Sequence, residues 1–209
     1  MSVATGKQLT EGSLLLDLVE RSLMLVISVW AIWRLAPAIT REPQVSLVLA
    51  SEMLAVAFIL LRRPARRIDV RPYAAAVAFV GTAAPLLVIA PGHGWLPPGV
   101  GSALMIGGLL FNISAKIALN RSFGLAAANR GVKRAGPYRL LRHPMYAGYA
   151  LTQVVFLLLN PCVWNLCVYG IAWSVQILRI GAEEKILQED PAYREYASQV
   201  RFRLIPGVY

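Results

Sequence analysis

Two polar motifs border the longest uncharged stretch of the chain. Over the 34 residues from Met145 to Leu178 the sequence contains no Asp, Glu, Lys, Arg or His. The segment RHPMYAGY, residues 142–149, opens this stretch, and Arg179 and Glu183 follow it. A helix that begins at Pro144 places its N-terminus beside His143, and helix N-termini with neighbouring arginines favour a negatively charged ligand group such as a carboxylate.

Arg179 and Glu183 are four residues apart and therefore lie on one face of a helix. The same spacing is found in ordinary surface ion pairs, and His143-Pro144 alone is compatible with the plain start of a membrane helix. Ionisable groups at membrane depth, however, usually face the interior of a bundle or a cavity. Glu184 lies about 100° further round the helix, so the sequence leaves open whether it joins a site or is solvated.

The composition is that of an integral membrane protein. Hydrophobic residues make up 57% of the chain and charged residues only 15%, and the mean hydropathy is +0.56. The net charge of +10 could suit nucleic acid. The lysines and arginines nevertheless lie in short blocks between apolar runs, which is how membrane proteins set their orientation, so we expect no nucleic-acid partner. Cys162 and Cys167 have no metal-ligand spacing, and no metal site is expected.

The apolar runs predict about six transmembrane segments. Four cover residues 14–33, 45–61, 73–90 and 100–119; Pro85 is a candidate kink, and Lys116 could snorkel from the end of the fourth. As one helix, the uncharged run would measure about 50 Å against a hydrocarbon core of about 30 Å. Asn160-Pro161 therefore divides it into a C-terminal helical hairpin. For Glu52, an acid within the second run, the sequence leaves open a pairing with Lys116 or an arginine, or protonation of the side chain.

Charge asymmetry predicts the orientation. The arginine-rich loops at 62–71 and 120–143 contrast with loops 91–97 and 160–161, which carry no Lys or Arg. This excess places both termini and the RHPMYAGY segment in the cytoplasm. If the protein is bacterial, the expected membrane is the inner, cytoplasmic membrane. Asp190-Pro191 predicts the start of an interfacial amphipathic helix, whose apolar face contains Tyr193, Tyr196 and Val200.

The expected fold is thus an all-α integral membrane protein with a single domain, residues 1–209. Four N-terminal transmembrane helices are expected within residues 13–119. The region 120–209 carries the motifs. They are GPYRLLRHPMYAGY (136–149), LNP (159–161), RIGAEEKIL (179–187) and YREYASQVRFRLIPG (193–207).

In this order and spacing, the four motifs resemble the isoprenylcysteine carboxyl methyltransferase and phospholipid methyltransferase family. The resemblance runs from about Arg121 to the C-terminus. It implies an integral membrane methyltransferase that binds S-adenosyl-L-methionine within a helix bundle. The absence of a G-x-G-x-x-G strand–turn–helix fingerprint agrees, because no Rossmann domain is then available to hold the cofactor.

The resemblance also implies roles for individual residues. Arg179 would face the substrate and act in catalysis, and Glu183 would contact the cofactor. The other residues implied to bind the cofactor are Tyr138, His143, Pro144, Met145 and Tyr146. Residues 130–133 correspond to a further cofactor segment, but their types depart from the family pattern, so only backbone contacts are expected there.

The implied acceptor is a lipophilic molecule in the membrane, either small or prenylated. A bidentate grip by Arg179 suits a carboxylate, as in carboxyl O-methylation of an isoprenylcysteine. N-methylation of a phospholipid amine is the closest alternative, and the sequence does not distinguish O-, N- and S-methylation or the oligomeric state. An NADPH-dependent sterol-type reductase fits less well, since Ala182-Glu183-Glu184 replaces the expected Arg-Asp-Glu and no cysteine follows Cys167. A non-enzymatic scaffold or channel component leaves the ordered motifs unexplained.

Overall fold

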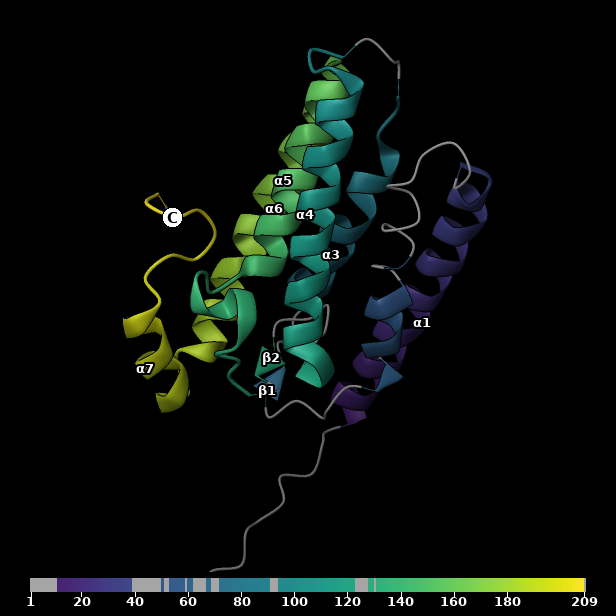
Figure 1. Cartoon of the computed structure of the whole chain (residues 1–209). Coiled ribbons are helices and arrows are strands. Elements are labelled where there is room, and N and C mark those ends of the chain that lie inside the picture. The colour runs from purple at the N-terminus through teal and green to yellow at the C-terminus, as the bar shows by residue number, and fades with distance from the viewer. Residues whose placement is uncertain are drawn as a thin grey trace, which may run out of the picture.

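The computed structural model describes residues 11–38, 50, 53–58, 60–61, 67–68, 72–90, 94–122, 128–129 and 131–208. These residues form a helix bundle (Figure 1). The helices are α1 (Glu11–Leu35), α3 (Pro72–Ala83), α4 (Pro98–Leu119), α5 (Pro144–Leu159), α6 (Val163–Leu187) and the shorter α7 (Pro191–Gln199). Short 3₁₀ turns cover Ala36–Ala38, Ala84–Leu87, Asn120–Ser122 and Gly136–Arg139. Apart from one antiparallel pair of two-residue strands, β1 (Arg67–Ile68) and β2 (Ala128–Asn129), the described chain is helical, as predicted.

Two of the helices end close to a proline that the sequence analysis singled out. The α-helix α3 stops at Ala83 and continues as the 3₁₀ turn that contains Pro85. The long uncharged run is likewise two helices, because α5 ends at Leu159 and α6 begins at Val163 after Asn160-Pro161. Cys162 then caps α6, its sulfur accepting the backbone N–H of Asn165 at 3.4 Å. The predicted break is confirmed.

Small residues bring α4 and α5 into close contact. A side chain at Gly148 of α5 would approach the Cα of Asn112 on α4 to 2.9 Å, so only glycine fits there. Gly108 of α4 is packed as closely, because a Cβ at this position would lie 2.9 Å from Cγ2 of Thr152. Asn112 also donates from Nδ2 to the carbonyl of Met145 at 2.8 Å. The N-terminus of α5 is therefore fixed to α4.

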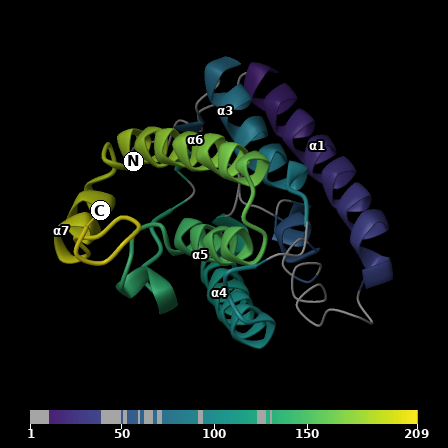
Figure 2. The ribbon, with the colours of Figure 1, turned by 90° about the horizontal axis from the view of Figure 1, so that it is seen from above.

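Helices α5 and α6 meet mainly through long side chains, and α5 lies between α4 and α6 (Figure 2). Trp173 donates from Nε1 to Oε1 of Gln153 at 2.8 Å. One turn further along, the rings of Phe156 and Tyr169 pack edge to face with centroids 6.2 Å apart. From the first pair to the second, the residue numbers rise along α5 and fall along α6, so the two helices are antiparallel.

Helix α7 begins as predicted. The side chain of Asp190 accepts the backbone N–H of Ala192 at 3.0 Å, and Pro191 occupies the first turn. The predicted face is buried as well, since Tyr193 and Tyr196 are 3% and 2% exposed and Val200 is 9% exposed. Helix α7 thus packs its apolar face against the bundle.

The outer surface of the bundle is apolar. Helices α4 and α6 are long and apolar enough to cross a membrane, and α5 is a shorter apolar helix of 16 residues. Large apolar side chains are exposed along their outer faces, among them Leu104, Leu110, Ile117, Leu151, Val154, Leu166, Ile171 and Ile177. This surface favours association with a membrane. The count of six spans, and the spanning hairpin, remain predictions.

Two sequence expectations concern charged residues of the apolar segments. The prediction that Lys116 snorkels outward is wrong. Its side chain is 0% exposed, and Nζ lies 5.1 Å from the ring centroid of Tyr149. A cation–π contact inside the bundle replaces contact with water. Glu52 lies outside the described residues, as does most of segment 45–61.

Candidate active site

A pocket opens where the C-terminal end of α6 meets the N-terminus of α5. The 3₁₀ turn Gly136–Arg139 and helix α7 complete its walls. The lining residues are Leu119, Ser122, Gly131, Val132, Lys133, Tyr138, Arg142, His143, Met145, Tyr146, Glu183, Leu187, Tyr193 and Tyr196. Because Pro144 occupies the first helical position of α5, the first backbone N–H groups of this helix, those of Met145 and Tyr146, have no acceptor within it.

Glu183 is the carboxylate of the pocket wall. The hydroxyl of Tyr146 donates to its Oε1 at 2.5 Å. Its Oε2 lies 3.6 Å from Nδ1 of His143, which is too long for a direct hydrogen bond. The Glu183 side chain keeps 18% of its surface exposed, so it is accessible from the pocket.

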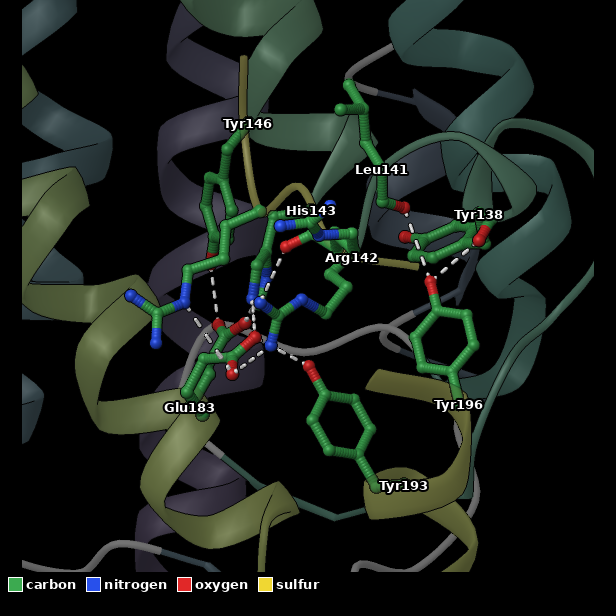
Figure 3. Close-up of polar contacts among 11 residues, drawn as sticks. Tyr138, Leu141, Arg142, His143, Tyr146, Glu183, Tyr193 and Tyr196 are labelled. Carbon is green, nitrogen blue, oxygen red and sulfur yellow. Dashed lines mark hydrogen bonds and ion pairs between the residues drawn. The ribbon is translucent and has the colours of Figure 1, made fainter. Parts of the chain in front are cut away.

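Glu184, the next residue, faces a different set of partners. Its Oε1 accepts from Nε2 of His143 at 2.9 Å and from the hydroxyl of Tyr193 at 2.7 Å. Its Oε2 pairs with Nη1 of Arg142 at 2.7 Å, and the Glu184 side chain is only 6% exposed. Since a carboxylate offers only acceptors, this contact requires a proton on Nε2 of His143. Figure 3 shows Arg142 and His143, from the loop before α5, and Tyr193, from α7, converging at the end of α6.

The C-terminal tail holds the loop that carries His143. The backbone N–H of Arg142 donates to the carbonyl of Phe202 at 2.9 Å, and that of His143 donates to the carbonyl of Arg203 at 2.8 Å. The hydroxyl of Tyr196 donates to the carbonyl of Tyr138 at 2.7 Å (Figure 3). The pocket is therefore built by segments that are distant in sequence and joined by hydrogen bonds.

Arg179 lies beside the pocket but does not line it. Its guanidinium carbon is 5.3 Å from the ring centroid of Tyr146, within the range of a cation–π contact. The residue is only 7% exposed. Nη1 would lie 3.8 Å from a Cβ built on Gly81, so the side chain reaches toward α3. Tyr146 thus contacts a carboxylate at the pocket and a buried cation behind it.

The part of the chain that contains the pocket matches a known protein family. Residues 98–194 match the phospholipid methyltransferase family, and the matched region extends from α4 into α7 and includes most of the pocket. The matched residues make up a little under half of the chain. The resemblance predicted from the motifs is confirmed. No curated protein matches the chain. The family indicates a membrane methyltransferase.

The residues that the resemblance assigned to the methyltransferase site lie together in the fold. Five of them line the pocket: Tyr138, His143, Met145, Tyr146 and Glu183. Pro144 does not line it; it is fully buried and sets the start of α5. Arg179 lies behind Tyr146. Of the predicted cofactor segment 130–133, residues 131–133 line the pocket, and residue 130 lies outside the described residues. The fold thus brings the predicted residues to one place, with Pro144 and Arg179 behind the pocket wall.

Sequence reasoning missed the residues that support the pocket. It did not decide the role of Glu184, and it predicted no role for Arg142, Tyr193 or Tyr196 in the pocket. Burial raises the pKa of Tyr196 to about 12. Burial and then the hydrogen bond to Glu184 raise the pKa of Tyr193 still further. Both phenols consequently remain protonated donors at neutral pH. Their helical spacing indicated only an apolar face, since a phenol hydroxyl's partner is decided by the tertiary fold.

Proposed function

We propose that the protein transfers a methyl group from S-adenosyl-L-methionine to a carboxylate of a lipophilic acceptor in the membrane, such as a prenylated cysteine. The family match supports methyl transfer. The observation that carries the choice of acceptor is the buried guanidinium of Arg179, packed on Tyr146 next to the pocket. A buried cation needs an anionic or aromatic partner, and a planar guanidinium suits a carboxylate better than an aminolipid, which is itself cationic.

The residues of the pocket fit the proposed cofactor. Glu183 supplies a partly exposed carboxylate, which suits the hydroxyl or ammonium groups of the molecule. The first amides of α5, at Met145 and Tyr146, together with the helix N-terminus, suit its carboxylate. The rings of Tyr138 and Tyr146 offer electron-rich faces for a sulfonium cation. When bound, the cofactor supplies an electrophilic methyl group on that sulfonium.

The protein's own contribution is alignment and exclusion of water. Arg179 holds the acceptor so that one carboxylate oxygen faces the pocket, and Tyr146, fixed by its bond to Glu183, separates the two binding regions. With an acceptor oxygen placed in this way, a bound cofactor would supply its methyl group to that oxygen and would leave as a neutral thioether, so the residues around it need only hold and align the two groups. No proton moves in this reaction, so the site needs no general base.

The family name favours a second candidate, N-methylation of a phospholipid amine. An ammonium acceptor must first lose a proton, and its charge would be repelled by Arg179. The two candidates differ in their products. Purified protein supplied with tritiated S-adenosylmethionine and membrane lipid extract should label lipid-soluble material, and mild alkali should release this label as methanol. Label that resists alkali would favour the amine, whereas binding of NADPH without S-adenosylmethionine would support a reductase.

Glu183→Ala is expected to weaken S-adenosylmethionine binding at least tenfold, or about 1.4 kcal/mol. The variant should still fold, because Glu183 is at the pocket surface and its neighbour Glu184 retains the buried contacts. Calorimetric titration of the purified protein measures the effect. Glu195→Ala, which removes an exposed carboxylate of α7, is the control and should bind like the parent. Equal affinity in all three proteins would contradict the assignment of Glu183.

The orientation is part of the proposal, in which residues 1–209 form one multi-pass membrane domain with both termini and the pocket facing the cytoplasm. Cysteines at Gly99 and Arg139, both exposed and near opposite ends of the bundle, test it. In a background with Cys162→Ser and Cys167→Ala, Arg139→Cys should react with an impermeant thiol reagent only from the cytoplasmic side, and Gly99→Cys only from the other side. The reverse labelling would separate the pocket from cytosolic cofactor.

A further inference from the structure

The tail that follows α7, residues 201–208, combines positive charge with apolar side chains. Glu195 of α7 is the last acidic residue in the sequence, and the tail carries Arg201 and Arg203. Its large apolar residues are Phe202, Leu204, Ile205 and Val208. Segments of this composition favour the surface of a membrane, where the apolar groups leave water and the cations meet anionic lipids.

Hydrogen bonds fix the tail at the level where the uncharged stretch of α5 begins. The backbone N–H of Arg142 donates to the carbonyl of Phe202 at 2.9 Å, and that of His143 donates to the carbonyl of Arg203 at 2.8 Å. The uncharged stretch starts soon after, at Met145. Charged residues are rare inside the hydrocarbon core, so the boundary of the core is expected near this level. The tail is therefore tied to the part of the protein that would meet the membrane surface.

The tail also lies on the side of α7 that faces the apolar helices. In Figure 1 it turns back from α7 and rises in the direction in which α5 runs away from the pocket. Figure 2, which views the bundle from above, shows the tail over α7. Because the apolar lengths of α4, α5 and α6 extend in this direction, the tail lies between α7 and the membrane that these helices would enter.

A turn at the end of the tail exposes apolar side chains. The backbone N–H of Val208 donates to the carbonyl of Ile205 at 3.2 Å, and Gly207 has a φ of +83°, a conformation that glycine adopts readily. Ile205 is 50% exposed and Val208 is 79% exposed. Leu204, by contrast, packs against the buried core cluster of the bundle. The turn is thus anchored to the protein while it presents apolar groups outward.

We propose that the turn 205–208 inserts into the headgroup region of the membrane leaflet next to the pocket, and that Arg201 binds the phosphate groups of anionic lipids there. Insertion removes the exposed side chains of Ile205 and Val208 from water. Arg201 is exposed beside the turn, and an arginine near an anionic membrane surface is favoured. Since the tail holds the loop of His143, this membrane contact also supports one wall of the pocket. The inference requires a bundle embedded in a membrane, but it does not depend on methyl transfer.

A fluorescent probe on the turn tests the inference. In the background with Cys162→Ser and Cys167→Ala, Val208→Cys is labelled and the protein is reconstituted into vesicles of phosphatidylcholine and phosphatidylglycerol. Lipids that carry a nitroxide near the headgroup should quench this probe. Iodide on both sides of the membrane should quench it at least about fivefold less than a probe at Ala192→Cys, the matched control at the exposed start of α7.

A second set of variants tests the role of charge. With the probe at Val208→Cys, Arg201→Gln should raise the ratio of exposed to inserted turn about fivefold in the anionic vesicles, and should have no effect in phosphatidylcholine alone. Arg194→Gln, which removes an exposed arginine of α7, is the control and should behave like the parent. Equal effects of the two variants, or no effect of either, would overturn the assignment of Arg201.

Insertion itself is overturned if iodide quenches the Val208→Cys probe as strongly as the Ala192→Cys probe. A probe shielded from both quenchers would overturn it too, because the turn would then pack against protein. Ile205→Cys should give the same result as Val208→Cys, which guards against a local effect of one substitution. Neither measurement uses cofactor or acceptor, so failure of the proposed methyl transfer would leave this inference standing, and its own failure would leave the proposed function untouched.

Discussion

Glu184→Ala is expected to lower the free energy of unfolding by about 3 kcal/mol. Removal of this carboxylate leaves Arg142 without its anionic partner and His143 without its acceptor, at a site where the Arg142 side chain is only 11% exposed. Tyr193 loses its partner in the same step. Uncompensated buried charge and unpaired donors together account for the size of the effect. Chemical unfolding of the purified protein in detergent measures it.

The same variant should also bind S-adenosylmethionine more weakly, although Glu184 does not line the pocket. Glu184 fixes the ring of His143, and the loop around His143 forms one pocket wall. Glu184→Gln keeps the shape and one acceptor but removes the charge, so it should fall between the parent and Glu184→Ala. Glu195→Ala, at the exposed pair with Arg134, should unfold like the parent. An unfolding free energy for Glu184→Ala close to that of the parent would refute the buried network.

The parts of the fold that sequence predicted well are those set by local rules. Asn160-Pro161 had to end a helix, because proline cannot continue it and disfavours helical backbone in the residue before it. Asp190-Pro191 likewise supplied a cap and a pre-set first turn for α7. In each case two adjacent residues decide the backbone, whatever surrounds them. The membrane topology depends on more than helix boundaries and remains a prediction.

Side-chain environments were predicted less well, since they depend on neighbours that are distant in sequence. Lys116 lies near the end of an apolar helix, where snorkelling is the general rule, yet Tyr149 from the next helix covers it. Glu184 differs from Glu183 only by a rotation of about 100°, and that rotation turns it toward Tyr193 and the loop before α5. No spacing within α6 reveals what the adjoining segments bring to that face.

The candidate site was found from the sequence through the motifs of a family rather than through geometry. Spacing alone placed Arg179 and Glu183 on one helix face but gave no reason to bring His143 or Tyr138 to them. The fold supplies that reason, because the C-terminal tail and α7 bind the loop between Tyr138 and His143.

Arg179→Ala is expected to lower kcat/KM for a carboxylate acceptor by about 100-fold or more, because a lost bidentate contact to a charged group costs a few kcal/mol. Cofactor affinity should stay within about threefold, since Arg179 does not line the pocket. Arg179→Lys should restore only part of the rate, because an ammonium cannot reproduce the planar fork. Lys185→Ala, an exposed cation of the same helix, serves as the control and should retain full activity.

Steady-state kinetics and cofactor titration on these variants separate three roles for Arg179. A surface ion pair with Glu183 would make Arg179→Ala nearly silent, but the residue is only 7% exposed and stacks on Tyr146, which already argues against that role. A cofactor-binding role would weaken S-adenosylmethionine binding as strongly as Glu183→Ala does. An amine acceptor would be methylated no more slowly once the repelling cation is removed. Only if Arg179 holds a carboxylate acceptor should Arg179→Ala lower turnover while cofactor binding persists. The buried guanidinium predicts this combination of results.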